Sequence, residues 1–238
     1  MLGPDRRTMT QAQLEAAQID VGLRQHMLRV YNYMASAVAL TGIVAYAAAS
    51  SQPLMQLLFA TPLKWVVMLA PLAFVLVLSF GIHRLSLFAS QAVFWVFAGV
   101  MGLSLSTIFI VFTGQSIARV FFITAASFGA LSLYGYTTKR DLSGMASFLI
   151  MGLFGIVIAG LVNMFLKSSG LQFAISVIGV LVFAGLTAYD TQRIKSEYLE
   201  SDPEETAGKK AIMGALALYL DFINLMMMLL QLLGQRRD

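Results

Sequence analysis

The stretch LYLDFINLMMMLLQLL, residues 218–233, is almost entirely apolar, yet it carries a carboxyl group at Asp221 and an amide at Asn224. The segment that contains it, residues 207–233, holds eight Leu, two Ile and one Phe, which together favour membrane insertion by about 3 to 7 kcal/mol. One acid near the centre of a span costs roughly 2.5–3.5 kcal/mol on the same scale. The segment therefore inserts with a small margin, and its acid needs polar neighbours from other spans.

Apolar runs of this kind recur along the chain of 238 residues, of which 58% are hydrophobic and only 12% charged. A soluble domain usually carries about twice that charged fraction, and a span needs about 20 apolar residues. We therefore expect an all-α polytopic membrane protein with seven spans, at residues 30–49, 64–82, 87–112, 117–137, 144–166, 171–190 and 207–233. The breaks are too short for a second soluble domain, so the spans form one domain over residues 29–238, after an amino-terminal arm at residues 1–28.

The distribution of positive charge predicts the orientation. Eleven Lys and Arg residues fall on the side of the amino terminus and five on the other side, and positive residues favour the cytoplasm. The arm is therefore expected in the cytoplasm and, with seven spans, the carboxyl terminus outside. The arm lacks the short apolar core of a signal peptide. The net charge of +4 contains no basic run, so nucleic acid is not an expected partner.

Helical periodicity divides the last span into two faces. Small and polar residues share one face, which we expect to look inward because small residues permit close helix approach: Gly214, Ala217, Asp221, Asn224 and Met228. The opposite face is wholly apolar and is expected to meet lipid: Leu216, Leu220, Ile223, Met227 and Leu230. An acid inside a membrane is a candidate functional group by default.

Asp190, in the segment LTAYDTQRIK, is the acid that we expect beside Asp221, and Thr187 lies one turn before it. The alternative for Asp190 is a helix-end acid in the head-group layer. The alternative for Asp221 is a carboxyl satisfied by neighbouring Asn or Ser side chains, without a function. Asn163 is a second inward polar group, and a hydrogen bond that only joins two helices is its alternative role.

His83 and Arg84 end the second span at about the depth expected for Asp190. Most such arginines extend to lipid phosphate, so pairing with a buried acid is the second of two alternatives. Neither His83 nor His26 has a cysteine or another histidine nearby, which leaves a histidine metal site unsupported. The chain has no cysteine, which excludes disulfides and thiol chemistry.

Two aspartates on neighbouring spans are also a feature of intramembrane aspartyl proteases. Those enzymes have a glycine pattern before the second aspartate, where this chain has Leu218, Tyr219 and Leu220. A retinal protein would need a lysine for its Schiff base, and residues 211–233 contain none. We therefore expect neither an enzyme nor a bound cofactor.

Four segments resemble the Bax inhibitor family, also called transmembrane Bax inhibitor motif proteins: GLSLSTIFIVFTG (102–114), FFITAASFGALSLYGYTTKRDLSG (121–144), AYDTQRIK (188–195) and LYLDFINLMMMLLQLLG (218–234). The resemblance runs from about residue 25 to the end of the chain. The mixed-charge arm and short loops are similar to those of bacterial members, which implies the inner membrane.

The resemblance implies a seven-helix fold with the last helix at its centre and a pH-sensitive calcium leak. It also implies a di-aspartyl sensor that falls on Asp190 and Asp221, with calcium as the transported ion that these carboxyls bind transiently. A basic latch belongs near the end of the second helix, where Arg84 and His83 compete in the segment GIHRLS. Physical chemistry agrees, because two carboxyls close together out of water cannot both ionise cheaply and titrate as a pair. Calcium prefers carboxylate oxygens.

The alternative function, also known in this family, is a membrane-embedded regulator that binds a membrane protease or the cell-death machinery. The chain has no large soluble surface for such a partner. The amino-terminal arm would therefore be the contact.

Overall fold

The computed structural model describes the backbone of residues 11–237 and the side chains of residues 21–237. Residues 1–10 of the expected arm lie outside this description, and from Gln11 onward the arm is helical and continues into the first span. The helices are α1 (Gln11–Ala49), α2 (Gln52–Phe59), α3 (Leu63–Gly81), α4 (Leu87–Leu105), α5 (Ile108–Val111), α6 (Gly114–Thr137), α7 (Ser143–Leu166), α8 (Ser169–Ser196) and α9 (Glu204–Leu233).

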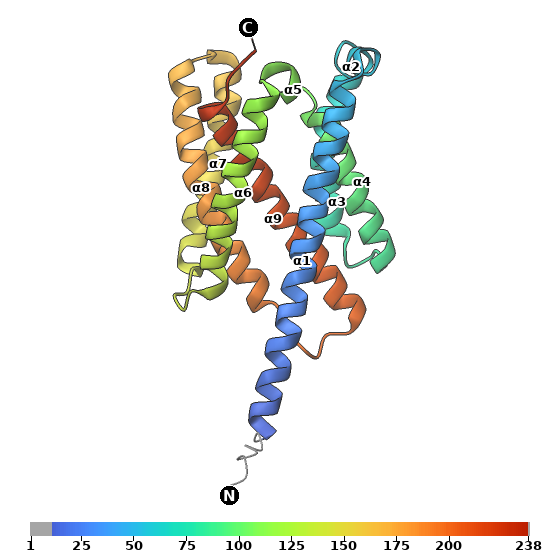
Figure 1. Ribbon diagram of the computed structural model, residues 1–238, viewed down its shortest axis with the longest axis vertical. Coiled ribbons are helices and arrows are strands. Elements are labelled where there is room, and N and C mark those ends of the chain that lie inside the picture. Colours follow the sequence, from blue (N-terminus) through green and yellow to red (C-terminus); the bar gives the residue numbers. More distant parts are fainter. Residues whose placement is uncertain (1–10, 238) are drawn as a thin grey trace, which may run out of the picture.

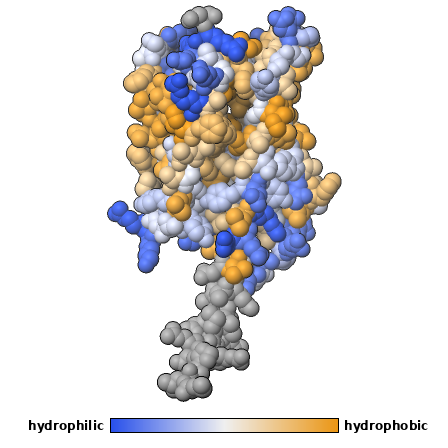
Figure 2. Space-filling model, viewed as in Figure 1, coloured by the Kyte–Doolittle hydropathy of each residue, from blue (hydrophilic) through white to orange (hydrophobic). Residues whose placement is uncertain are grey.

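Among the described residues, seven segments are long and apolar enough to cross a membrane, which confirms the predicted all-α membrane protein with seven spans. The first is the part Val21–Ala49 of the longer helix α1, and the third joins α4 to the short α5. Figure 2 shows a broad hydrophobic band between two hydrophilic ends. The segments are Val21–Ala49, Leu63–Gly81, Leu87–Val111, Gly114–Thr137, Ser143–Leu166, Ser169–Ser196 and Glu204–Leu233.

Helix α9 runs obliquely between α6, α7 and α8 on one side and α1, α3 and α4 on the other (Figure 1). It packs against α8, α1, α6, α4 and α3. The expectation that its leucine face meets lipid is therefore wrong: Leu216, Ile223 and Leu230 are 2%, 6% and 0% exposed. A helix that is apolar on nearly all sides is buried either in a protein core or in a membrane. An apolar face alone does not distinguish a protein core from lipid, since both are hydrocarbon.

Two glycines hold the end of α8 that carries Asp190 close to its neighbours. A Cβ at Gly135 would overlap the carbonyl oxygen of Ala188, so α6 and α8 meet backbone to backbone. On α9, a Cβ at Gly214 would come within 3.1 Å of the Ile194 side chain. Small residues at such crossings let helices in a membrane approach closely.

Candidate functional site

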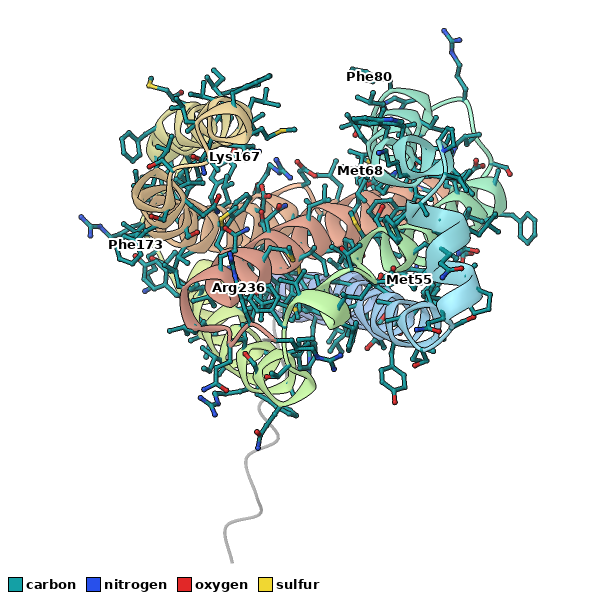
Figure 3. The ribbon with its side chains drawn as sticks, turned by 90° about the horizontal axis from the view of Figure 1, so that it is seen from above. Met55, Met68, Phe80, Lys167, Phe173 and Arg236 are labelled. Atoms are coloured by element: carbon teal, nitrogen blue, oxygen red, sulfur yellow. The ribbon has the colours of Figure 1, made fainter. Side chains whose placement is uncertain are left out.

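A cavity of about 570 Å³ lies against α9, with walls from α3, α7, α8 and α9. Figure 3 shows α3, which carries Phe80, and α7, which ends before Lys167, standing apart on one face with α9 behind them. The wall residues from α3 and α7 include Val75 and Leu153 and contain no titratable group. The charged and amide residues of the cavity all come from α8 and α9: Asp190, Arg193, Glu197, Asp221 and Asn224.

The structure brings the two predicted acids together in this cavity. Asp190 is 8% exposed and Asp221 4% exposed, and their carboxyl groups lie within hydrogen-bonding reach of each other. The Oδ2 atom of Asp221 is buried and receives no hydrogen bond from a donor among the described residues. Because an ionised carboxylate only accepts hydrogen bonds, a bond between two carboxyls exists only when one carries a proton. A hydrogen bond between these two carboxyls therefore requires one proton, which the two helices would share.

Hydroxyl groups fix the position of α8 beside this pair. Thr191 donates to the carbonyl of Thr187 at 2.8 Å and also contacts the Ser132 hydroxyl of α6 at 2.9 Å. Ser132 in turn meets the Tyr31 hydroxyl of α1 at 2.5 Å. Thr187, a predicted supporting residue, donates to the Phe183 carbonyl of its own helix at 2.8 Å. These hydroxyls therefore join α1, α6 and α8 and do not reach the acids.

The cation that meets the acid pair is Arg193, one turn after Asp190 on the same helix. Its Nη2 lies 3.0 Å from Oδ1 of Asp190, and its Nε lies 3.6 Å from Glu197, too far for a hydrogen bond. The expected latch residues, Arg84 and His83, are exposed at the end of α3 and do not line the cavity. In this structure the basic partner of Asp190 is therefore Arg193, because the i,i+3 spacing on α8 needs no second helix to bring the two charges together.

The remaining predicted polar residues fall in two places. Asn224 lines the cavity, and its Nδ2 donates to the Leu220 carbonyl at 2.8 Å. Asn163 is buried at the other end of the bundle, where its Nδ2 donates to Gln172 at 3.1 Å and its Oδ1 accepts from the Ser168 N–H at 3.0 Å. Asn163 therefore ties α7 to α8 and is not part of the acid cavity.

Sequence reasoning counted Arg193 only as a loop charge that sets orientation. The signal that would have found it is its position three residues after Asp190, which places both on one helix face. Over the side chains described, no group of three or more His, Cys, Asp or Glu residues is placed to hold a metal ion. Two carboxyls and the Asn224 amide oxygen fall short of the six to eight oxygens of a tight calcium site. This donor set suits brief contact with a cation.

Comparisons with known proteins identify the family of this chain. The family model described as inhibitor of apoptosis-promoting Bax1 matches residues 23–238. The chain is 52% identical over 219 residues to the uncharacterized protein RP147 of Rickettsia prowazekii, which covers 92% of this chain and 93% of that protein. It is 50% identical over 219 residues to the inner membrane protein YbhL of Escherichia coli K12, with 91% and 94% covered. The chain therefore belongs to the Bax inhibitor family.

Proposed function

We propose that this member of the Bax inhibitor family is a pH-sensitive calcium leak channel of the bacterial inner membrane, gated by the Asp190–Asp221 pair. The observation that carries the proposal is the buried Oδ2 of Asp221, which has no donor, on a residue that lines one cavity together with Asp190. A leucine at this position would favour insertion, whereas an acid opposes it. An acid kept at this cost, beside a second acid, is suited to binding a proton or a cation.

The gate follows from the charges around the pair. With one shared proton, the pair carries a single negative charge, which Arg193 balances at 3.0 Å from Asp190. Loss of that proton leaves two like charges in contact, which must separate or bind a cation. Apart from the acid pair itself, the charged residues that line the cavity are Arg193 and Glu197. The lining residues from α3 and α7 carry no charge. Flux should therefore rise as pH rises, because deprotonation opens the contact and frees oxygens for calcium.

A conduction path needs one further movement, at a hydrophobic constriction. A polar cavity of about 590 Å³ lies at the opposite end of the bundle, lined in part by Ser176 and Gln231. From Asn224 to Gln231 the helix rises about 10 Å, and this interval holds Leu225, 1% exposed, and Met228. The Met228 side chain lies against Gly179 of α8. Apolar constrictions of this kind gate channels by excluding water, so we place the closed gate here.

The test is calcium entry into dye-loaded liposomes that contain the purified full-length protein, followed from pH 5 to 8. Below the midpoint, a flux limited by one deprotonation changes about tenfold per pH unit. Asp190→Asn and Asp221→Asn keep the side-chain shape and remove the titrating group, so each should flatten this dependence. Asn163→Asp, which adds a carboxyl outside the cavity, is a matched control that should leave it unchanged. Equal leaks from wild type and both Asn variants at every pH would refute the proposal.

The orientation is part of the proposal. The charge distribution favours a cytoplasmic amino terminus and an external carboxyl terminus. Single cysteines introduced at residues 5 and 236 of the cysteine-free chain should react with an impermeant reagent from opposite sides of the membrane. Reaction of both from one side would contradict seven spans in this orientation.

A regulator that binds another membrane protein is the second candidate function. The favouring observation is that α1 extends beyond the other helices at the amino-terminal end (Figure 1). Deletion of residues 1–20 separates the two functions. The channel proposal expects the pH-dependent flux to survive this deletion, whereas a binding role expects loss of partner capture with unchanged flux.

A further inference from the structure

A second, smaller cavity of about 330 Å³ lies beside the connection from α6 to α7, at the same end of the bundle as Asp190. In Figure 1 this connection is the loop below α6 and α7. The lining of this smaller cavity includes three cations, Lys139, Arg140 and Arg193, and one acid, Asp141. The lining therefore has an excess of positive charge. None of the ion pairs found among the described side chains involves Lys139 or Arg140.

The connection is held in a defined position by one side chain of α8. The Nε2 of Gln192 donates to the Arg140 carbonyl at 2.8 Å, and its Oε1 accepts from the Leu142 N–H at 2.8 Å. Asp141 accepts from the hydroxyl and the N–H of Ser143 at 2.6 and 2.9 Å, and these bonds lower the pKa of Asp141. Asp141 is thus bonded to Ser143, and none of the ion pairs among the described side chains joins it to Lys139 or Arg140.

Arg193 belongs to both cavities. It lines the acid cavity, where it pairs with Asp190, and it lines the basic cavity beside Lys139 and Arg140. A guanidinium has five N–H donors, and the buried Nε of Arg193 has no hydrogen-bond partner among the described residues. One side chain therefore connects a positively charged surface cavity to the buried acid pair, and its Nε also lies 3.6 Å from Glu197.

We propose that the basic cavity binds the phosphate of an anionic membrane lipid and that the bound phosphate competes with Asp190 for Arg193. Arginine binds phosphate, as it binds carboxylate, with two parallel hydrogen bonds, so a phosphate can replace Asp190 as its partner. We favour a lipid as the source of this phosphate because the first turns of α7 carry Met145 and Phe148, which are 46% and 71% exposed. These two side chains form an apolar surface that acyl chains can contact. The regulatory half of this proposal rests on the proposed channel function, whereas the binding half does not.

Binding is tested by native mass spectrometry of the purified full-length protein with phosphatidylglycerol or phosphatidylcholine added. Each basic residue near a lipid surface contributes roughly fivefold to affinity. The double variant Lys139→Gln/Arg140→Gln should therefore bind phosphatidylglycerol on the order of 25-fold more weakly, with phosphatidylcholine binding unchanged. The matched control, Lys64→Gln/Arg119→Gln, removes two exposed cations that line neither cavity and should bind as wild type does.

Two binding outcomes would overturn the lipid site. Equal losses in the double variant and its control would mean that only general surface charge attracts the lipid. Displacement of phosphatidylglycerol by an equal concentration of inorganic phosphate would mean that the cavity selects the free anion. Retention of the lipid under that competition supports the assignment.

Regulation is tested in liposomes of phosphatidylcholine with and without phosphatidylglycerol. When a phosphate takes Arg193, the acid pair loses its balancing cation and keeps its proton to a higher pH, so the lipid should shift the flux–pH curve upward. Lys139→Gln/Arg140→Gln should respond less than wild type does and should leak normally in phosphatidylcholine alone. An equal shift in wild type and variant would overturn the regulatory role. Absence of flux in every lipid would refute the channel proposal and leave the binding result standing.

Discussion

Helix α9 presents two buried polar residues to opposite sides of the bundle, and their surroundings differ. Tyr219 is 0% exposed, and its hydroxyl meets the Thr41 hydroxyl of α1 at 2.7 Å. Thr41 is also within 2.8 Å of the Ala98 carbonyl of α4, and the Tyr219 ring packs edge-on against Phe97 with centroids 5.2 Å apart. Asp221, two positions on, has an oxygen without a donor and borders a cavity.

The difference separates a structural polar group from a group available for chemistry. The network at Tyr219 is enclosed on all sides, so burying its hydroxyl costs little and joins α1, α4 and α9. Asp221 lines the cavity whose walls come from α3, α7, α8 and α9, and its Oδ2 atom receives no hydrogen bond from a donor among the described residues. A buried polar atom left without a partner destabilises the fold. Its retention next to a cavity is better explained by a ligand than by packing.

The largest expected effect is that of Asp221→Leu. Replacing the acid by leucine removes a buried carboxyl oxygen that has no donor among the described residues, so the melting temperature of the purified protein should rise. Calcium flux should be lost, because the pair no longer exists. A lower melting temperature together with normal flux would mean that Asp221, like Tyr219, serves only to stabilise the fold. Thermal unfolding in detergent and the liposome assay decide between these outcomes.

A smaller effect is expected for Arg193→Gln, which removes the only cation found within 4 Å of Asp190 among the described residues. A nearby arginine typically favours the ionised form of an acid by about 1–3 pH units. The midpoint of the flux–pH curve should therefore move up by about one unit, since Arg193 is partly exposed and screened. Arg84→Gln is the matched control, because Arg84 does not line the cavity. An equal shift in both variants would show that Arg193 has no specific role.

How far the sequence could predict these regions depends on the kind of signal. The spans follow from the length and apolarity of each run, and the importance of Asp221 follows from its cost within one span. The lipid-facing side of α9 could not be predicted, because burial against five helices and burial in lipid select the same residues. Asn163 was predicted only as an inward polar group, but its depth was predictable: Asn163 and Asp190 lie near the carboxyl ends of consecutive antiparallel spans and hence at opposite ends of the bundle.

A weaker effect is expected at the hydrophobic constriction between the two cavities. Met228→Ala shortens the side chain that fills the space against Gly179. Removing that contact should admit water and raise the leak at low pH about threefold, an effect that corresponds to about 0.7 kcal/mol. Met226→Ala, at a neighbouring position of α9 outside both cavity linings, is the control. A leak unchanged by Met228→Ala and raised by Met226→Ala would move the gate elsewhere.

The smallest effect is expected for Tyr219→Phe, and it completes the comparison. The change removes one hydroxyl and leaves Thr41 bonded to the Ala98 carbonyl, so little buried polarity is left unpaired. A single hydrogen bond of this kind contributes about 1 kcal/mol net, which corresponds to about 2–4 °C in melting temperature for a chain of this size. The flux–pH curve should coincide with that of wild type, because the hydroxyl does not border the acid cavity. A shifted curve would mean that the two sides of α9 are coupled, and the division into a structural side and a functional side would then fail.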